Sequence, residues 1–317
     1  MPHVLIAGKL HPAGLARIEA AAGYTFDYVE EISEPSYAAL IDKADALVIR
    51  TQPLTGATLA KATRLKLVSR HGVGFDSVDL PALNQRRIPL CIAGDTNSLS
   101  VAEHSMTLIL ACAKQVLRAD RAVREGAWKW RDRLEATEIS GKRLLIVGYG
   151  RAGAKLGRMA EGFDMDVRAF DPYLAARGWP PGQVSPVATL AEGLAWADIV
   201  SLNVPKAEKP LLGMQELALL RPGAIVVNTA RGGVVDEAAL ADALTEGHVA
   251  AAGLDVFDDE PPAISHPLLA FDQVILSPHI AGVTKQASQR MAVTSVQNVI
   301  DFFAGRLDPS LIVNKEF

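Results

Sequence analysis

The sequence predicts an α/β protein built from two doubly wound parallel sheets, and three observations support this. Short apolar runs alternate with amphipathic helical stretches along most of the chain, which is typical of parallel strands with helices on both faces. The 317 residues exceed what one hydrophobic core usually supports, so we expect two domains. A glycine-rich segment at residues 148–153 (GYGRAG) also follows an apolar run and opens a helical stretch.

The first sheet is expected within residues 1–98. Its predicted strands are the apolar runs at residues 4–7, 46–49, 67–69 and 90–92. Its predicted helices lie between these runs, near residues 13–22, 37–44, 56–62 and 80–86. This alternation predicts one parallel α/β unit.

A long helix, from residue 100 to about 125, is expected to lead into the second sheet, with Ser98 or Ser100 as N-cap and Glu103 completing a capping box. That sheet should contain six strands, at residues 144–147, 167–170, 199–202, 225–228, 251–254 and 274–276. An amphipathic helix at residues 284–303 and the following tail are expected to return to the first domain. The predicted domains are therefore residues 1–98 plus 286–317, and an inserted domain at 99–285.

Composition limits the classes of partner. A net charge of −4 gives no general attraction to nucleic acid or anionic lipid, so an acidic ligand would need a local cation. Cys91 and Cys112 lie in apolar runs, as reduced core thiols do. The longest apolar stretch, residues 106–113, is too short to span a bilayer, and the first residues lack a signal-peptide pattern. We therefore expect a cytoplasmic protein without a membrane or nucleic-acid partner.

The glycine-rich segment predicts a dinucleotide site. Gly148 would permit the tight turn, Gly150 would let the pyrophosphate approach the backbone, and Gly153 would pack helix against strand. Arg151 and Ala152 complete the turn, which places the helix N-terminus toward the phosphates. Asp171, 18 residues after Gly153, follows the second strand and would meet the ribose hydroxyls. Its charge would repel a 2′-phosphate, which favours NAD(H) over NADP(H); a simple turn residue before Pro172 is the alternative.

Other strand ends should complete the cofactor pocket, because ligands of open α/β sheets collect at the carboxyl ends of strands. Asp255 either stabilises the nicotinamide ring or caps a turn. The remaining candidates are Val204, Pro205, Thr229, Ala230, His279 and Gly282.

Three charged residues at later strand ends suggest the chemistry. Reduction of a 2-oxo acid needs a proton donor for the carbonyl oxygen and a cation for the carboxylate. His279 suits the donor, Glu260 would orient and support its imidazole, and Arg231 would anchor the carboxylate through two hydrogen bonds. Singly, each residue could equally be a loop or turn residue. Because the three residues occur together and follow a dinucleotide motif, they predict a catalytic site, and we expect this site to contain no metal ion.

These residues lie in segments that resemble the D-2-hydroxyacid dehydrogenase family, over residues 48–305. The segments are NTARG around Arg231, DVFDDEP ending at Glu260 and its proline, and SPHIAG around His279. The resemblance implies a Rossmann NAD-binding domain inserted into a flavodoxin-like substrate domain, and an oxidoreductase of class EC 1.1.1. It further implies that the backbone amides of Val73 and Gly74 receive the substrate carboxylate, that Thr96 or Asn97 lies near the nicotinamide, and that Asn97 contacts the substrate. His104 is interpreted as packed within its helix.

Within the family the likeness is greatest to phosphoglycerate dehydrogenases and to hydroxypyruvate or glyoxylate reductases. Arg50 is placed to reach the distal end of a substrate such as a phosphate, or is a salt-bridged rim residue. The identity of the acid and the physiological direction stay open. Formate dehydrogenases carry glutamine at the position of Glu260, which argues against that reaction.

The resemblance also suggests a homodimer formed through the cofactor domain, to which Trp128 and Trp130 would supply apolar anchors. A different class of function remains as an alternative. Some NAD(H)-sensing corepressors share the fold and the three charged residues, and these would bind the dinucleotide with little turnover.

Overall fold

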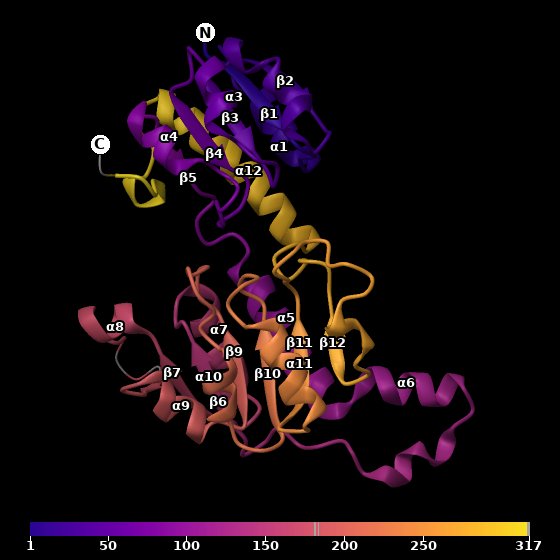
Figure 1. Ribbon diagram of the computed structural model, residues 1–317. Helices are drawn as coiled ribbons and strands as arrows, with labels where there is room; N and C mark the ends of the chain where they lie inside the picture. The colour runs from indigo at the N-terminus through magenta and orange to yellow at the C-terminus, as the bar shows by residue number, and fades with distance from the viewer. Residues whose placement is uncertain (181, 183, 316–317) are drawn as a thin grey trace. The chain divides into compact units, whose positions relative to one another are not determined.

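The computed structural model describes residues 1–180, 182 and 184–315, and the chain divides into two compact units. Unit 1 contains Met1–Asn97 and the chain from Val283 onward, and unit 2 is Ser98–Gly282. The sequence-based boundaries, at residues 98/99 and 285/286, differ from these by one to three residues. Each unit contains one parallel sheet flanked by helices, so the predicted fold class is confirmed (Figure 1).

The sheet of unit 1 has five parallel strands in the order β2-β1-β3-β4-β5. One of them, β2, was not predicted. Its residues alternate between polar and apolar and none is buried, so it lacks the continuous apolar run of its neighbours. The strands are β1 (His3–Ala7), β2 (Thr25–Val29), β3 (Ala46–Ile49), β4 (Leu67–Arg70) and β5 (Leu90–Cys91), and the helices between them are α1 (Pro12–Glu19), α2 (Glu34–Ala38), η1 (Ile41–Lys43), α3 (Gly56–Lys61) and α4 (Leu80–Gln85).

The C-terminal helix α12 (Lys285–Phe303) belongs to the core of unit 1. Its buried side chains Val296 and Val299 share a hydrophobic cluster with Val4 and Ile6 of β1. After the short helix η4 (Pro309–Leu311), the side chain of Asn314 accepts a 2.7 Å hydrogen bond from the backbone N–H of Leu90. Residues near the two ends of the described chain therefore stabilise one hydrophobic core, as the gold helix beside the purple strands illustrates (Figure 1).

The sheet of unit 2 has seven parallel strands in the order β12-β11-β10-β9-β6-β7-β8. Six were predicted; the seventh, β8, is a two-residue edge strand with exposed side chains and no apolar signal. The strands are β6 (Arg143–Val147), β7 (Asp166–Phe170), β8 (Ser185–Pro186), β9 (Ile199–Leu202), β10 (Ala224–Asn228), β11 (Val249–Leu254) and β12 (Val274–Leu276). The helices that follow them are α7 (Arg151–Glu161), α8 (Pro172–Arg177), α9 (Leu190–Trp196), α10 (Met214–Ala218), α11 (Glu237–Thr245) and η3 (Pro267–Ala270).

Both faces of this sheet are buried. Leu145 and Val147 of β6 belong to one hydrophobic cluster, whereas Leu144 and Ile146 belong to another that also contains residues of helix α5 (Ser98–Lys114). A strand covered on both faces reads as an uninterrupted apolar run, which is why β6 was recognisable from sequence.

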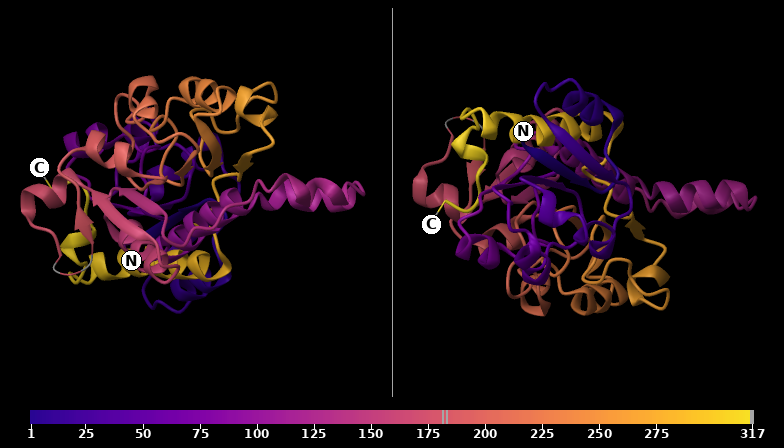
Figure 2. Two further views of the ribbon diagram at one scale, coloured as in Figure 1. Left: turned by 90° about the horizontal axis from the view of Figure 1, so that it is seen from below. Right: turned by 90° about the horizontal axis from the view of Figure 1, so that it is seen from above.

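The predicted single helix from residue 100 to about 125 is wrong in two respects. Helix α5 already includes Ser98 and Ser100, so neither is its N-cap. It then ends at Lys114, and α6 (Val116–Arg124) begins after Gln115, whose left-handed φ of 53° breaks the helix. Because α5 is packed in the core and α6 is mostly exposed, the chain changes environment at that break. Figure 2 shows the magenta segment of α6 and η2 (Trp128–Arg133) standing away from the sheet of unit 2.

The structure also bears on the cysteines and on the length of the apolar helices. Both cysteines are buried free thiols, and burial raises the pKa of Cys91 to about 11. Within the described residues, no helix has the length and hydropathy that crossing a bilayer requires.

The turn between β6 and α7 leaves no room for a side chain at two of its glycines. Gly148 has a φ of +89°, and a Cβ there would lie 2.6 Å from the carbonyl oxygen of Asn203. A Cβ on Gly153 would lie 2.2 Å from the carbonyl oxygen of Gly148, so α7 packs directly on the turn. Gly150, by contrast, has a negative φ and open space where a Cβ would stand. The fold thus requires Gly148 and Gly153, whereas it leaves the position beside Gly150 open.

This difference gives a test of the turn. Gly153→Ala should lower the free energy of unfolding by roughly 1–3 kcal/mol, as overpacking does. Gly150→Ala should change it by less than about 0.5 kcal/mol, the usual range for a substitution without new contacts. Chemical denaturation of both variants measures the difference. Equal destabilisation by the two substitutions would contradict the close packing of α7 on the turn.

Candidate active site

The carboxyl ends of the parallel strands of unit 2 carry the three charged residues singled out in the sequence. Glu260 lies in the segment after β11, His279 follows β12, and Arg231 follows β10. Because neighbouring strands β10, β11 and β12 run parallel, these segments leave the same edge of the sheet.

His279 and Glu260 form a hydrogen-bonded pair. Nδ1 of His279 lies 2.7 Å from Oε2 of Glu260, and the side chains are 50% and 37% exposed. The other carboxylate oxygen of Glu260 accepts a 3.1 Å hydrogen bond from the backbone N–H of Phe257. Within the described residues Nε2 of His279 has no hydrogen-bond partner. The pair therefore presents a fixed imidazole with one ring nitrogen open to a ligand.

The backbone of His279 is held in an unusual conformation. Its φ of 52° lies in the left-handed region, which costs a non-glycine residue roughly 1–2 kcal/mol. The backbone N–H of His279 donates to the carbonyl oxygen of Asp255, at 2.8 Å. The carboxylate of Asp255 accepts from the backbone N–H groups of Ile280 and Ala281, at 2.9 and 2.8 Å. Asp255 thus clamps the segment that carries His279.

Asp255 itself is fully buried, and its carboxylate also accepts from the hydroxyl of Ser277 at 2.5 Å. Of the two interpretations weighed for Asp255, turn capping describes what its carboxylate does in this structure. His104 also differs from the expectation of simple packing within its helix, because its Nε2 lies 2.9 Å from Oγ of Ser277. No sequence signal pointed to this contact, since the two residues are 173 positions apart.

Arg231 is positioned by the turn after β10. The side chain of Asn228 bonds to the backbone on both sides of this turn, accepting from the N–H of Ala230 and donating to the carbonyl of Arg231. Nη1 of Arg231 donates to the carbonyl of Ala230 at 2.6 Å. A Cβ on Gly232 would lie 1.8 Å from the carbonyl oxygen of Phe257, so the Arg231 segment rests directly on the segment leading to Glu260. Sequence reasoning missed Asn228 as a positioning residue.

The expected cofactor residues also lie along this edge of unit 2. Asp171 follows β7. One oxygen of its carboxylate caps α8 by accepting from the N–H groups of Tyr173 and Leu174, and the other accepts from the N–H of Tyr149 in the glycine turn.

The other expected cofactor residues lie at further strand ends. Val204 lies close to Gly148, and Pro205 beside it is exposed. Thr229 is buried and shares a 2.7 Å hydrogen bond with Ser105 of α5. Ala230 is buried, Arg151 and Ala152 begin α7, and Gly282 ends unit 2.

The glycine turn fits a dinucleotide. Gly150 is the N-cap of α7 and has no side chain to bond with the first-turn N–H groups. These donors, together with the positive end of the helix dipole, suit a pyrophosphate. The open space beside Gly150 lets such a group reach the backbone. Among the described residues no cluster of three or more histidine, cysteine or acidic side chains has the arrangement of a metal site.

Unit 1 holds the expected substrate residues at the carboxyl ends of its strands. Arg50 follows β3 and its Nη1 donates to the carbonyl of Lys9 at 3.2 Å, and among the described residues it forms no salt bridge. Partly buried Val73 and Gly74 follow β4, and Asn97 ends the first segment of unit 1. Burial, with the charges of Arg50 and Arg70, lowers the pKa of His71 to about 4. At neutral pH His71 is therefore uncharged, whereas Arg50 and Arg70 beside it carry positive charge.

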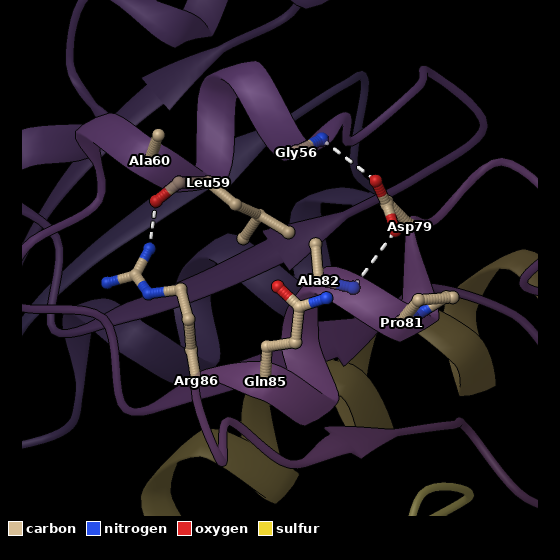
Figure 3. Close-up of a pocket in the computed structure, with 8 residues that line it drawn as sticks. All are labelled: Gly56, Leu59, Ala60, Asp79, Pro81, Ala82, Gln85 and Arg86. Atoms are coloured by element: carbon tan, nitrogen blue, oxygen red, sulfur yellow. Dashed lines mark hydrogen bonds between the residues drawn. The ribbon is translucent and has the colours of Figure 1, made fainter.

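A separate hollow of about 470 Å³ lies between α3 and α4 of unit 1 (Figure 3). Its polar groups serve the packing of the two helices. Asp79 accepts from the backbone N–H groups of Gly56 and Ala82, and Arg86 donates to the carbonyls of Leu59 and Ala62. None of the expected site residues lines this hollow.

Comparison with known proteins places the chain in a family. The sequence pattern described as "D-isomer specific 2-hydroxyacid dehydrogenase, NAD binding domain" matches residues 106–281. A D-3-phosphoglycerate dehydrogenase of Mycobacterium bovis is 39% identical over 98% of this chain and 59% of its own length. A glyoxylate reductase of Korarchaeum cryptofilum is 34% identical over 99% of this chain and 96% of its own length.

Solved structures agree with these relatives. The TT0316 protein of Thermus thermophilus is 30% identical, with a TM-score of 0.88 over 98% of this chain and 99% of that one. An NADPH-dependent glyoxylate/hydroxypyruvate reductase of Sinorhizobium meliloti is 26% identical, with a TM-score of 0.86 over 99% and 98% of the two chains. The chain spans between half and three fifths of the length of the phosphoglycerate dehydrogenases it matches. From the matched pattern and the full-length likeness to the glyoxylate reductase, the chain belongs to the family of D-isomer specific 2-hydroxyacid dehydrogenases.

Proposed function

We propose that this protein is an NAD(H)-dependent oxidoreductase that interconverts a small D-2-hydroxy acid and its 2-oxo acid. The observation that carries the proposal is the 2.7 Å hydrogen bond between His279 and Glu260, which leaves Nε2 of the imidazole open at the sheet edge. An imidazole held by a carboxylate is suited to exchanging a proton with a substrate near neutral pH. Family membership supports the same reaction class.

Each of the three charged residues has a separate task in this proposal. In the reducing direction, protonated His279 gives its Nε2 proton to the carbonyl oxygen as that oxygen gains negative charge. Glu260 orients the ring through Nδ1 and stabilises its positive charge. Arg231 binds the substrate carboxylate and polarises the neighbouring carbonyl. When bound, the nicotinamide supplies the hydride that the carbonyl carbon accepts. In the oxidising direction His279 would take up the hydroxyl proton and the bound nicotinamide would accept the hydride.

The assignment of NAD(H) rests on Asp171 and the glycine turn. The carboxylate of Asp171 is fixed by three backbone N–H groups at the end of β7, where it would repel a 2′-phosphate. Solved relatives bind either NAD or NADPH, so the family alone does not decide between them. We assign the open space beside Gly150 to the pyrophosphate.

A dinucleotide-sensing corepressor is the alternative function. The relatives described above carry the names of dehydrogenases and reductases, which favours catalysis over sensing. The partly exposed His279–Glu260 pair, open at Nε2, supports the same choice.

Substitutions of His279 and Arg231 test the proposal. His279→Ala should lower kcat by about 10²–10⁴-fold, the usual contribution of an acid–base group. Arg231→Lys should mainly weaken kcat/KM for the 2-oxo acid, because lysine cannot form the bidentate pair. Dissociation constants for NADH, from fluorescence, should stay near the wild-type value. If wild-type protein turns over no 2-oxo acid, or His279→Ala keeps full activity, the proposal is wrong.

We further propose that the substrate is one of three 2-oxo acids: 3-phosphohydroxypyruvate, hydroxypyruvate or glyoxylate. Arg50 would select the group at the distal end of the acid, and its carboxylate end would contact Val73, Gly74 and Asn97.

Substitution of Arg50 distinguishes these acids. If a phosphate binds at Arg50, Arg50→Ala should reduce kcat/KM for 3-phosphohydroxypyruvate at least about tenfold more than for hydroxypyruvate, the equivalent of about 1.4 kcal/mol. Steady-state kinetics with both acids, using NADH and NADPH, provide the measurement and its internal control. Equal losses on the two acids would assign Arg50 to the rim and exclude a phosphate there.

The assembly that we propose is a homodimer formed through unit 2. The segment of α6 and η2 stands away from its sheet (Figure 2). It exposes the apolar side chain of Trp128 at 66%, and Leu134, the residue after η2, is 86% exposed. Trp130 instead lies under the guanidinium of Arg118, at 5.8 Å. Exposed aromatic and aliphatic side chains on a projecting segment are typical of an interface between copies.

Sedimentation analysis tests this assembly. The wild-type protein should have the mass of a dimer at micromolar concentration, and the double substitution Trp128→Glu, Leu134→Glu should yield monomers, because two charges would be buried in the interface. Ile264→Glu is the matched control, since Ile264 is also in unit 2, 98% exposed and outside the segment. A monomeric wild type would exclude the dimer.

A further inference from the structure

His104 stands out among the polar groups that the proposed chemistry does not use. It lies on α5, but its ring nitrogen Nε2 ends 2.9 Å from Oγ of Ser277 and 3.6 Å from Oδ1 of Asp255. Ser277 and Asp255 both belong to the structure that holds His279. A histidine that merely fills space in a helix would not meet a buried carboxylate and its hydroxyl partner.

The pattern of donors and acceptors fixes the direction of these hydrogen bonds. The carboxylate of Asp255 can only accept hydrogen bonds, and it does so from two backbone N–H groups and from the hydroxyl of Ser277. A serine hydroxyl has only one proton to donate. Its oxygen must therefore accept from His104, which means that Nε2 of His104 carries hydrogen. The chain of bonds runs from His104 through Ser277 to Asp255.

The same helix reaches a second strand end through the adjacent residue. Ser105 Oγ bonds to Thr229 Oγ1 at 2.7 Å, in the segment between β10 and Arg231. Consecutive residues of α5 thus contact the segment leading to Arg231 and the segment leading to His279. Helix α5 is therefore placed to set the positions of Arg231 and His279.

We propose that His104 is a positioning residue for His279. By donating to Ser277, it fixes the hydroxyl that completes the Asp255 clamp, and the clamp keeps residues 279–281 in the strained turn that presents the imidazole. His104 touches neither substrate nor cofactor in this scheme. It affects the rate of the proton-transfer step and leaves the binding of the dinucleotide and the acid nearly unchanged. The inference rests on the proposed oxidoreductase function.

The test compares His104→Leu, which removes the donor at similar volume, with His104→Gln, whose amide N–H can replace it. His104→Leu should lower kcat about tenfold, with KM for the 2-oxo acid and the dissociation constant of NADH within twofold of wild type. His104→Gln should recover kcat to within about threefold. Ser277→Ala should match His104→Leu, and the double variant should lose no more than either single variant.

His3→Leu is the control, because His3 has the same 21% side-chain exposure and also contacts a carboxylate, that of Asp27 in unit 1. It should leave kcat unchanged. Additive losses in the double variant, no recovery by glutamine, or wild-type kcat in Ser277→Ala would each overturn the proposal. Ser277→Ala and His104→Gln keep it testable if His104→Leu does not fold.

Amide hydrogen exchange separates this inference from the proposed function. The N–H groups of Ile280 and Ala281 should exchange faster in His104→Leu and Ser277→Ala than in wild type or His104→Gln. This readout needs no turnover. A wild type without activity would refute the oxidoreductase proposal while exchange still tests the clamp, whereas unchanged exchange in both variants would refute the clamp alone.

Discussion

The buried carboxylate of Asp255 is the constraint on which the shape of the candidate site in unit 2 depends. A charge removed from water costs several kcal/mol unless polar partners replace the solvent. Here the partners are a serine hydroxyl and two backbone N–H groups, all from the segment after β12. The segment must therefore keep its shape for the charge to stay satisfied. The strained backbone of His279 is maintained by this requirement.

Helix α5 links the parts of the edge that are distant in sequence. Ser98 at its start accepts a 2.7 Å hydrogen bond from Lys155 on α7, the helix of the glycine turn. Ser105 and His104, two turns later, reach the ends of β10 and β12. Because its apolar side chains are packed in the core beneath the sheet, α5 gives these polar contacts a fixed base. The glycine turn, the segment of Arg231 and the segment of His279 thus all contact α5 or the helix bonded to it.

The sequence predicted the features that depend on local pattern. Strands buried on both faces, such as β6, appear as apolar runs, and the contexts of Arg231, Glu260 and His279 identified strand ends. Local pattern did not reveal β2, whose side chains are only partly buried. It also missed the break at Gln115, where a left-handed backbone separates the buried α5 from the exposed α6. The contact of His104 with Ser277 depends on how α5 crosses β12, and no spacing in the chain encodes it.

The close approach of Gly232 to Phe257 has a mechanical consequence. With a carbonyl oxygen where a side chain would begin, the two segments have no clearance between them. Neither segment can move toward the other at this point, so the close contact couples their backbones. A displacement of the backbone that carries Arg231 would therefore displace the backbone leading to Glu260, so that the two charged groups would move together.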